Sequence, residues 1–383
     1  MTKLTKQFIS GIMMVLMILS SVQILSMTSF ATNVVTEKES NDGSNTATVI
    51  PTDTICSGAL DHTEDVDWYK FTADKDYFTF DFACSLDENN YANVNYGWDV
   101  YLYDATGNEI CVQRGVTGKL STAKYPLTGD FFIKVEHNWN CVFEFDKPIG
   151  CVYTIKINTT VDPMWEDENN DMISKAFKID TDKKYHGTFH SYTDVDYYKF
   201  TNDKDYFVFN FDISDDANMD LINYGWNITI WAEDGVTLVK EYSEVKSGFE
   251  SSILPFSGNC YIKVEPSKNC IFNIDCPVDC YYDIKVDTYK DSTWEKESNG
   301  TMSKAIKITS GKVYNGNLYM ESDVDYFKYT ATKNGVLTLD FFRDVSENIG
   351  NGWKITAVRA DGTEIYSTNM VNTLKITKTN IKR

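Results

Sequence analysis

Two short segments of the chain place several oxygen-bearing side chains on one face. Glu37, Glu39 and Asn41 alternate with other residues, and Asp65 and Asp67 alternate in the same way. In extended backbone, alternate side chains project from one face, so each segment presents its oxygen atoms together. Two such rows facing each other would form an all-oxygen cage. Calcium takes six to eight hard oxygen ligands, whereas zinc prefers His or Cys. The pattern therefore predicts a calcium site.

The acidic pattern occurs three times. Glu37, Glu166 and Glu295 follow one another at equal intervals, and the Asp-Val-Asp triplets that begin at positions 65, 194 and 323 keep the same interval. Gly300 replaces the last acid of the third copy, so we expect that site to be the weakest. The competing interpretation is an acidic, solvated linker. The predicted calcium ligands are Glu37, Glu39, Asn41, Asp42, Asp65 and Asp67; Glu166, Glu168, Asn170, Asp171, Asp194 and Asp196; and Glu295, Glu297, Asn299, Asp323 and Asp325.

The segments that carry these residues have the sequence pattern of β-strands. Tyr69 and Phe71 alternate with Trp68 and Lys70, and similar short segments are separated by Asp, Asn and Gly. A repeat as long as this one is a whole domain. About eight strands per repeat indicate an all-β chain of tandem antiparallel β-sandwich modules with jelly-roll-like topology. One Gly-Trp pair per repeat, ending at positions 98, 226 and 353, is expected in the core.

The N-terminus has the pattern of a signal peptide. Lys3 and Lys6 precede an apolar run over residues 8–25, and small residues follow it. We expect a signal peptide over 1–31, export to the extracellular space, and no stable insertion into a membrane. The repeats are then 32–160, 161–289 and 290–383. The last is expected to lack two strands, because the counterpart of Phe131 falls beyond Arg383; a truncated gene and a strand-accepting sheet are both open explanations.

The net charge limits which classes of molecule this chain can bind. The sequence has 56 acidic and 36 basic residues and a formal net charge of −20. Nucleic acids and anionic membranes are therefore poor partners. Bound cations would neutralise part of this charge, and the 14% aromatic content argues against disorder.

Several motifs together resemble the bacterial pre-peptidase C-terminal domain, which includes the collagen-binding modules of clostridial collagenases. They are Glu-x-Glu-x-Asn-Asp, a following Gly, Asp-x-Asp with aromatic residues, and Gly-x-aromatic-aromatic-Ile-x-Val. The resemblance spans the first two repeats and the front of the third. It implies a secreted accessory module of extracellular hydrolases, with calcium at the first motif. Collagen is only one candidate ligand, because the penultimate strand alternates into Lys134 and Glu136, or Lys263 and Glu265.

The sequence offers no catalytic constellation of a known type. None of His62, His137, His186 and His190 recurs in all three repeats, and His186 and His190 are interpreted as a solvated pair. The carboxylate pairs repeat with the fold, which suits a structural site better than one catalytic cleft. We therefore expect a non-enzymatic protein that binds an extracellular polymer, protein or glycan, or a cell surface. The alternatives are an accessory or propeptide-like partner of a secreted hydrolase, and a plain spacer.

Nine cysteines in an exported chain suggest disulfides. Cys141 and Cys151 correspond to Cys270 and Cys280 in the next repeat, so bridges Cys141–Cys151 and Cys270–Cys280 are predicted. Cys260 and Cys276 occur only in the second repeat, which suggests a third bridge. The remaining three are expected at buried strand positions: Cys56, Cys84 and Cys111.

Overall fold

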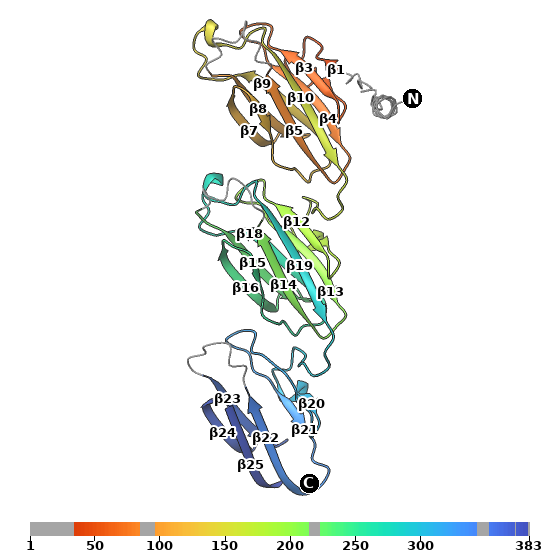
Figure 1. Cartoon of the computed structure of the whole chain (residues 1–383), viewed down its shortest axis with the longest axis vertical. Coiled ribbons are helices and arrows are strands. Elements are labelled where there is room, and N and C mark those ends of the chain that lie inside the picture. The colour runs from red at the N-terminus through yellow and green to blue at the C-terminus, as the bar shows by residue number, and fades with distance from the viewer. Residues whose placement is uncertain (1–33, 85–95, 214–222, 343–351, 372, 382–383) are drawn as a thin grey trace, which may run out of the picture.

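The structure is a computed structural model that describes residues 34–84, 96–213, 223–342, 352–371 and 373–381. The predicted signal peptide lies outside these residues. The described part is built of strands and short 3-10 turns, in three modules that follow one another in a row (Figure 1). No helix in the described ranges is long and apolar enough to cross a membrane. The all-β, tandem β-sandwich architecture expected from the sequence is confirmed.

The first module contains two five-stranded sheets. Its first sheet has the order β1-β3-β10-β5-β8, with strands β1 (Val34–Thr36), β3 (Ile55–Ala59), β10 (Val152–Thr160), β5 (Tyr77–Cys84) and β8 (Lys119–Ser121). Its second sheet has the order β2-β4-β9-β6-β7, with strands β2 (Thr48–Val49), β4 (Asp67–Ala73), β9 (Gly129–His137), β6 (Trp98–Asp104) and β7 (Glu109–Val116). Among the described strands of this module, only β1–β3 and β2–β4 pair in parallel.

The second module repeats this topology, except that a single parallel bridge between Trp165 and His186 replaces the pairing of β1 with β3. One sheet has the order β11-β13-β18-β15-β16, with strands β11 (Phe177–Lys178), β13 (Asp196–Asn202), β18 (Gly258–Pro266), β15 (Trp226–Ala232) and β16 (Leu238–Val245). The other has the order β12-β19-β14-β17, with strands β12 (Lys184–Thr188), β19 (Tyr281–Tyr289), β14 (Tyr206–Ile213) and β17 (Phe249–Glu250).

The third module has two-stranded sheets among its described residues. The pairs are β20 (Ile306–Ile308) with β21 (Phe327–Tyr329), β22 (Gly335–Phe342) with β25 (Thr373–Ile381), and β23 (Trp353–Val358) with β24 (Glu364–Val371). Phe341 contacts Trp353 at 5.7 Å between ring centroids, as Phe211 contacts Trp226 in the second module. The third module thus keeps this ring contact, although the side chains of β22 and β23 are only half-buried or exposed.

Alternating side chains build the core of each complete module. In β4, Asp67, Tyr69 and Phe71 point inward and are buried, while Trp68 and Lys70 lie on the outer face. Trp98 and Trp226 are fully buried, as expected, whereas Trp353 is only half-buried. Burial of such aromatic side chains supplies the main stabilising term of the sandwich.

Four short 3-10 turns complete the described secondary structure. They are η1 (Glu144–Asp146), η2 (Ile173–Lys175), η4 (Asn273–Asp275) and η5 (Met302–Lys304). The turns η2 and η5 occupy equivalent positions in the second and third modules. The turns η1 and η4 lie in two loops described below.

Candidate metal sites

Backbone hydrogen bonds hold the first acidic segment between two strands. The Glu37 amide donates to the carbonyl of Ser57 (2.9 Å), and the Trp68 amide donates to the carbonyl of Asn41 (2.9 Å). Carboxylate oxygens of Glu37, Glu39 and Asp67 consequently lie within 4.8 Å of one another. The structure thus brings these residues together from two segments that are well separated in the sequence.

The amide group of Asn41 faces this cluster. Its inner atom lies 3.2 Å from both Glu39 Oε2 and Asp67 Oδ1. If this atom is nitrogen, it donates to both carboxylates; if it is oxygen, only a cation can satisfy the group, because three acceptors then converge. In the structure Nδ2 donates to Thr48 Oγ1 (3.4 Å), so Oδ1 faces the carboxylates and offers calcium a further ligand.

The second and third modules hold corresponding clusters. Oxygens of Glu168, Asp194 and Asp196 lie within 4.8 Å of one another, as do those of Glu295, Glu297 and Asp325. Asn170 and Asn299 are buried beside them and donate through Nδ2 to Glu166 and Glu295, respectively.

Buried oxygens without a partner mark these two clusters as suited to a cation. Within the described ranges, Asn170 Oδ1 and Asp196 Oδ1 accept no hydrogen bond, and neither do Glu297 Oε1 and Asn299 Oδ1. A buried acceptor that lacks a donor costs free energy, which a calcium ion would recover by coordination. The residues present therefore fit a hard divalent cation.

In each complete module, two tyrosines behind the acidic cluster form hydrogen bonds with two of the predicted acidic ligands. The Tyr198 hydroxyl donates to Glu166 and lies 2.7 Å from the Tyr282 hydroxyl, which donates to Asp196. The equivalent chain in the first module runs through Tyr69 and Tyr153 to Glu37 and Asp67. The alternation of the sequence predicts these tyrosines only as parts of strands. Their recurrence at the repeat interval, each at a constant spacing from an acid, was the available signal.

Glycine is required where this layer meets strand β12. A Cβ atom built on Gly187 would lie 2.4 Å from Cζ of Tyr282 and 2.5 Å from the Tyr198 hydroxyl oxygen. Gly58 in β3 meets the hydroxyl of Tyr69 in the same way. These glycines therefore mark the closest approach of the two sheets at the acidic site.

Burial disfavours the charged form of the clustered carboxylates. It raises the pKa of Asp67 to about 8, with further contributions from Glu37 and Asp65. It also raises the pKa of Glu297 to about 7, with Asp323 adding to the effect. A bound divalent cation would reverse this cost, because it stabilises the carboxylates in their charged form.

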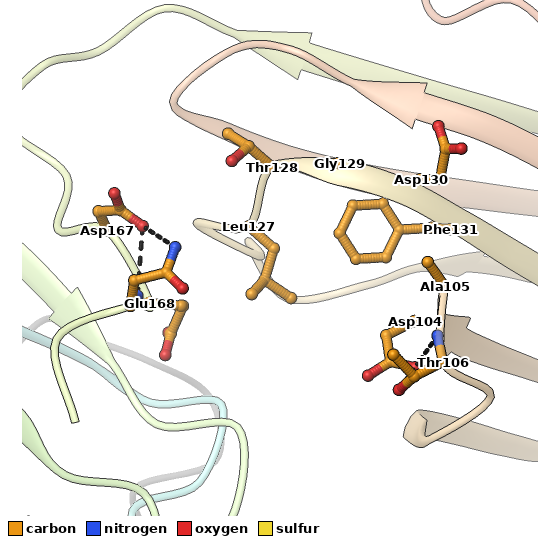
Figure 2. Close-up of a pocket in the computed structure, with 11 residues that line it drawn as sticks. Asp104, Ala105, Thr106, Leu127, Thr128, Gly129, Asp130, Phe131, Asp167 and Glu168 are labelled. Atoms are coloured by element: carbon orange, nitrogen blue, oxygen red, sulfur yellow. Dashed lines mark hydrogen bonds between the residues drawn. The ribbon is translucent and has the colours of Figure 1, made fainter.

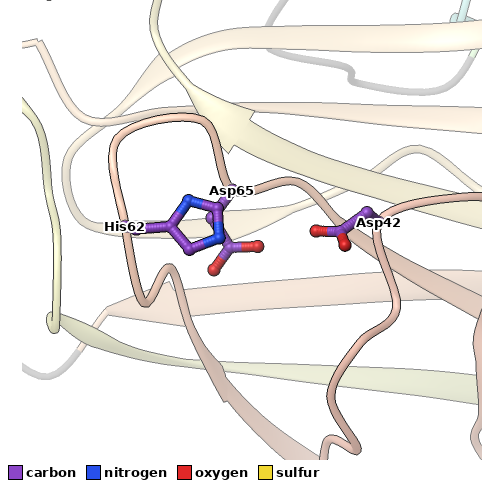
Figure 3. A group of neighbouring side chains, drawn as sticks. All are labelled: Asp42, His62 and Asp65. Atoms are coloured by element: carbon purple, nitrogen blue, oxygen red, sulfur yellow. The ribbon is translucent and has the colours of Figure 1, made fainter.

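Not every predicted ligand joins a cluster. Glu166 accepts hydrogen bonds from the Thr188 amide (2.6 Å) and from Tyr198, so both of its oxygens are engaged. Asp171 is exposed, and Asp323 accepts the Tyr319 amide at 3.0 Å. In the first module Asp42 and Asp65 form a group with His62 (Figure 3), and Asp65 remains close enough to add to the rise that burial causes in the pKa of Glu39 and of Asp67. The ligands predicted from the sequence do not include His62.

The second and third clusters lie where one module meets the next. The Glu168 amide donates to the carbonyl of Pro126 (3.4 Å), and the Glu297 amide donates to that of Pro255 (3.0 Å). Figure 2 shows the open hollow at the first junction, with Leu127 between Glu168 and Phe131. Ring pairs repeat at the junctions as well: Tyr77 with Trp165 at 5.2 Å and Tyr206 with Trp294 at 5.4 Å.

The histidine prediction requires a correction. His190 Nε2 lies 2.8 Å from Glu168 Oε1, and the His190 ring contacts Tyr125 of the first module at 5.2 Å. His186 Nδ1 lies 2.6 Å from Asp283. The interpretation as a solvated pair is wrong for His190, because the contact between modules buries it.

The predicted disulfides also differ from the structure. Cys270 bonds to Cys276, since the turn η4 brings their Cα atoms to 5.6 Å, and this excludes the bridges Cys270–Cys280 and Cys260–Cys276. Cys260 instead points into the core. Cys141 and Cys151 are separate, buried thiols. Of the three expected strand cysteines, Cys56 and Cys84 are buried and Cys111 is half-buried.

Exposed apolar residues gather in one loop of each complete module. These tip loops, residues 138–151 and 267–280, join the last two strands. Figure 1 shows their short turns, yellow and teal, at the same corner of the two modules. The exposed residues are Trp139 (70%), Val142 (77%), Phe143 (58%) and Phe145 (69%) in the first loop, and Ile271 (65%), Phe272 (65%) and Ile274 (74%) in the second.

Solved structures with similar arrangements include several extracellular modules. The pre-peptidase C-terminal domain of a collagenase from Bacillus anthracis is 13% identical, with a TM-score of 0.22, over 29% of this chain and 94% of that one. A putative secreted protein from Eubacterium rectale is 10% identical, with a TM-score of 0.21, over 64% and 80%. The tandem CBM51 modules of a family 98 glycoside hydrolase from Streptococcus pneumoniae are 11% identical, with a TM-score of 0.18, over 62% and 85%. No protein-family model and no curated protein matches the sequence.

Proposed function

We propose that this chain is a secreted, non-catalytic row of β-sandwich modules, stabilised by calcium, that binds an extracellular polymer through its tip loops. The observation that carries the binding role is the repetition of exposed apolar side chains at equivalent loop positions. An exposed apolar side chain gains nothing in the free protein, and clusters of them mark interaction sites. Two such loops at the same corner of adjacent modules allow bivalent binding to a repetitive partner.

The shared chemistry of the loops favours a protein partner over a glycan. Phe143 and Phe145 stack at 5.2 Å in the first loop, but Ile274 replaces Phe145 in the second. A flat aromatic platform is thus present in only one loop, whereas bulky apolar side chains are present in both. Apolar anchors that enter pockets are typical of protein interfaces.

Calcium supports this role by fixing the ends of the modules. The clusters at Glu168 and Glu297 lie beside the backbone contacts to Pro126 and Pro255. An ion that joins the acidic segment to the Asp-Val-Asp strand holds the beginning of each module against the preceding one. The tip loops then keep a constant spacing along the row.

The calcium role is tested by thermal unfolding with calcium and with a chelator. Calcium that binds only the folded state must raise the melting temperature in a concentration-dependent way. The combined variant Glu168→Gln with Asp194→Asn should lose most of the second module's response, whereas Asp234→Asn, in an exposed turn, should retain it. Identical curves for the wild type in calcium and in chelator would contradict the proposal.

The binding role is tested by retention on collagen, chitin, cellulose and peptidoglycan. We expect retention on a protein polymer, with a loss of about tenfold or more in the double variant Phe143→Ser with Phe272→Ser, because both valences are removed. Val236→Ser, which removes an exposed apolar side chain elsewhere, is the matched control. A plain spacer would be retained on none of the four, and an accessory partner would bind only a hydrolase.

A further inference from the structure

We infer that the first module carries a second metal site, formed by Asp42, His62 and Asp65, that takes a divalent transition ion such as Zn²⁺. One possible ligand atom from each residue lies within 4.8 Å of the other two. Figure 3 shows the Asp65 carboxylate between His62 and Asp42, with one imidazole nitrogen turned toward it. Three ligands from the residues before β2 and before β4 thus converge on one point.

Asp65 supplies the independent sign of a ligand. Its side chain is only 1% exposed, and Oδ1 is a buried oxygen that accepts no hydrogen bond from any described residue. The other oxygen accepts the Asp61 amide at 2.5 Å, which fixes the orientation of the carboxylate. A buried, oriented and unpartnered carboxylate oxygen is costly unless a cation coordinates it.

The other two ligands are exposed and can adjust their positions. The Ser40 hydroxyl donates to Asp42 Oδ2 (2.6 Å), so Oδ1 remains for an ion. His62 Nδ1 accepts a long hydrogen bond (3.3 Å) from the Glu64 amide. If Nε2 binds the ion, Nδ1 carries the proton of the neutral ring, and this hydrogen bond is lost. Tetrahedral ligands at about 2.0–2.2 Å stand about 3.4 Å apart, so small rotations of these two side chains complete the geometry.

The imidazole determines which ion the site selects. Calcium and magnesium bind oxygen ligands, whereas an imidazole with two carboxylates suits zinc and the other divalent first-row transition metals. Three protein ligands also leave a fourth position open to water or to a ligand group. This site therefore differs in chemistry from the all-oxygen cluster of Glu37, Glu39 and Asp67.

Only the first repeat has the complete set. The equivalent positions are Asp171, Ser191 and Asp194 in the second repeat, and Gly300, Met320 and Asp323 in the third. Since neither Ser191 nor Met320 offers an imidazole, the expected stoichiometry is one such ion per chain. The second repeat also provides an internal comparison with both carboxylates present.

The test is a calorimetric titration of the full chain with ZnCl₂ in saturating CaCl₂. We expect the wild type to bind one more zinc ion than His62→Gln, and Asp42→Asn to bind that ion about tenfold or more weakly. His137→Gln, a histidine of the same module outside the cluster, should behave like the wild type. Ser191→His should gain one ion, because it adds the missing ligand to the second repeat.

Two results would overturn the inference. One is a zinc stoichiometry and affinity that His62→Gln leaves unchanged. The other is zinc binding that calcium abolishes and Glu39→Gln removes, since Asp42 and Asp65 would then belong to the calcium cluster. The zinc titration depends on His62, whereas the calcium test depends on the melting temperature. Either result can therefore fail while the other holds.

Discussion

The ammonium group of Lys124 lies 4.7 Å from the ring centroid of Trp165, and the rings of Tyr77 and Tyr281 are each 5.2 Å away. Lys124 and Tyr77 belong to the first module, whereas Trp165 and Tyr281 belong to the second. The Lys124 amide also donates to the Tyr281 hydroxyl (2.8 Å). A cation among three aromatic faces therefore joins the two modules.

Lys124→Gln should loosen this junction without unfolding either module. A cation–π contact contributes about 0.5–2 kcal/mol, depending on its exposure to solvent, and the variant loses three of them. Small-angle scattering should show a broader distribution of maximum dimensions, and proteases should cleave faster between residues 160 and 166. Lys119→Gln, on the exposed strand β8, is the control. Equal scattering profiles for both variants would show that the lysine does not hold the junction.

The calcium-free protein should lose stability as the pH rises from about 5 to 8. The folded-state pKa values of Asp67 (about 8) and Glu297 (about 7) lie above their usual values because these groups are buried. A carboxyl whose pKa is raised on folding stabilises the fold below its unfolded pKa, and this contribution is lost as the pH rises through the folded value. Denaturant unfolding in chelator at several pH values measures the effect.

Calcium should reverse this trend. The ion binds the deprotonated carboxylates, so its affinity increases with pH, and the stabilisation by a fixed calcium concentration should be larger at pH 8 than at pH 5. A calcium-free protein that becomes more stable between pH 5 and 8 would contradict the clustering of these acids.

Gly187→Ala should destabilise the second module by roughly 1–3 kcal/mol, the usual cost of overpacking. Its new methyl group would meet both Tyr198 and Tyr282 at distances that no side chain tolerates. Gly118→Ala is the matched control, because a Cβ atom there meets nothing within 4 Å. Chemical denaturation of the two variants gives the comparison, and equal midpoints would refute the close approach of the sheets.

Much of the fold was predictable because two features of the sequence, the repeat interval and the alternation of side chains, report directly on structure. The constant interval between the acidic motifs identified the repeats, and alternation such as that of Tyr69 and Phe71 identified strands. The disulfide Cys270–Cys276 was not predictable from the repeat, because it depends on how tightly η4 folds one loop back. The grouping of Asp42 and Asp65 with His62 depends on the path of the chain between two strands, which spacing alone does not define.

Tyr198→Phe should weaken calcium binding at the second site and destabilise the second module. The variant removes a hydroxyl that donates to the fully buried Glu166, which costs about 1–3 kcal/mol. Burial raises the pKa of Glu166 to about 7, and the hydrogen bond from Tyr198 opposes this shift, so the loss of the hydroxyl favours the protonated form of Glu166. A higher pKa means that calcium must displace a proton at neutral pH.

The calcium deficit of Tyr198→Phe should therefore be larger at pH 7 than at pH 9, because the lost hydroxyl no longer supports the charged form of Glu166. Calcium titrations at both pH values, followed by melting temperature, measure this difference. Tyr197→Phe is the control, since its ring lies on the outer face of the same strand and stacks on Trp231 at 6.3 Å. If both variants lose calcium affinity equally at both pH values, the hydroxyl of Tyr198 does not set the charge of the site.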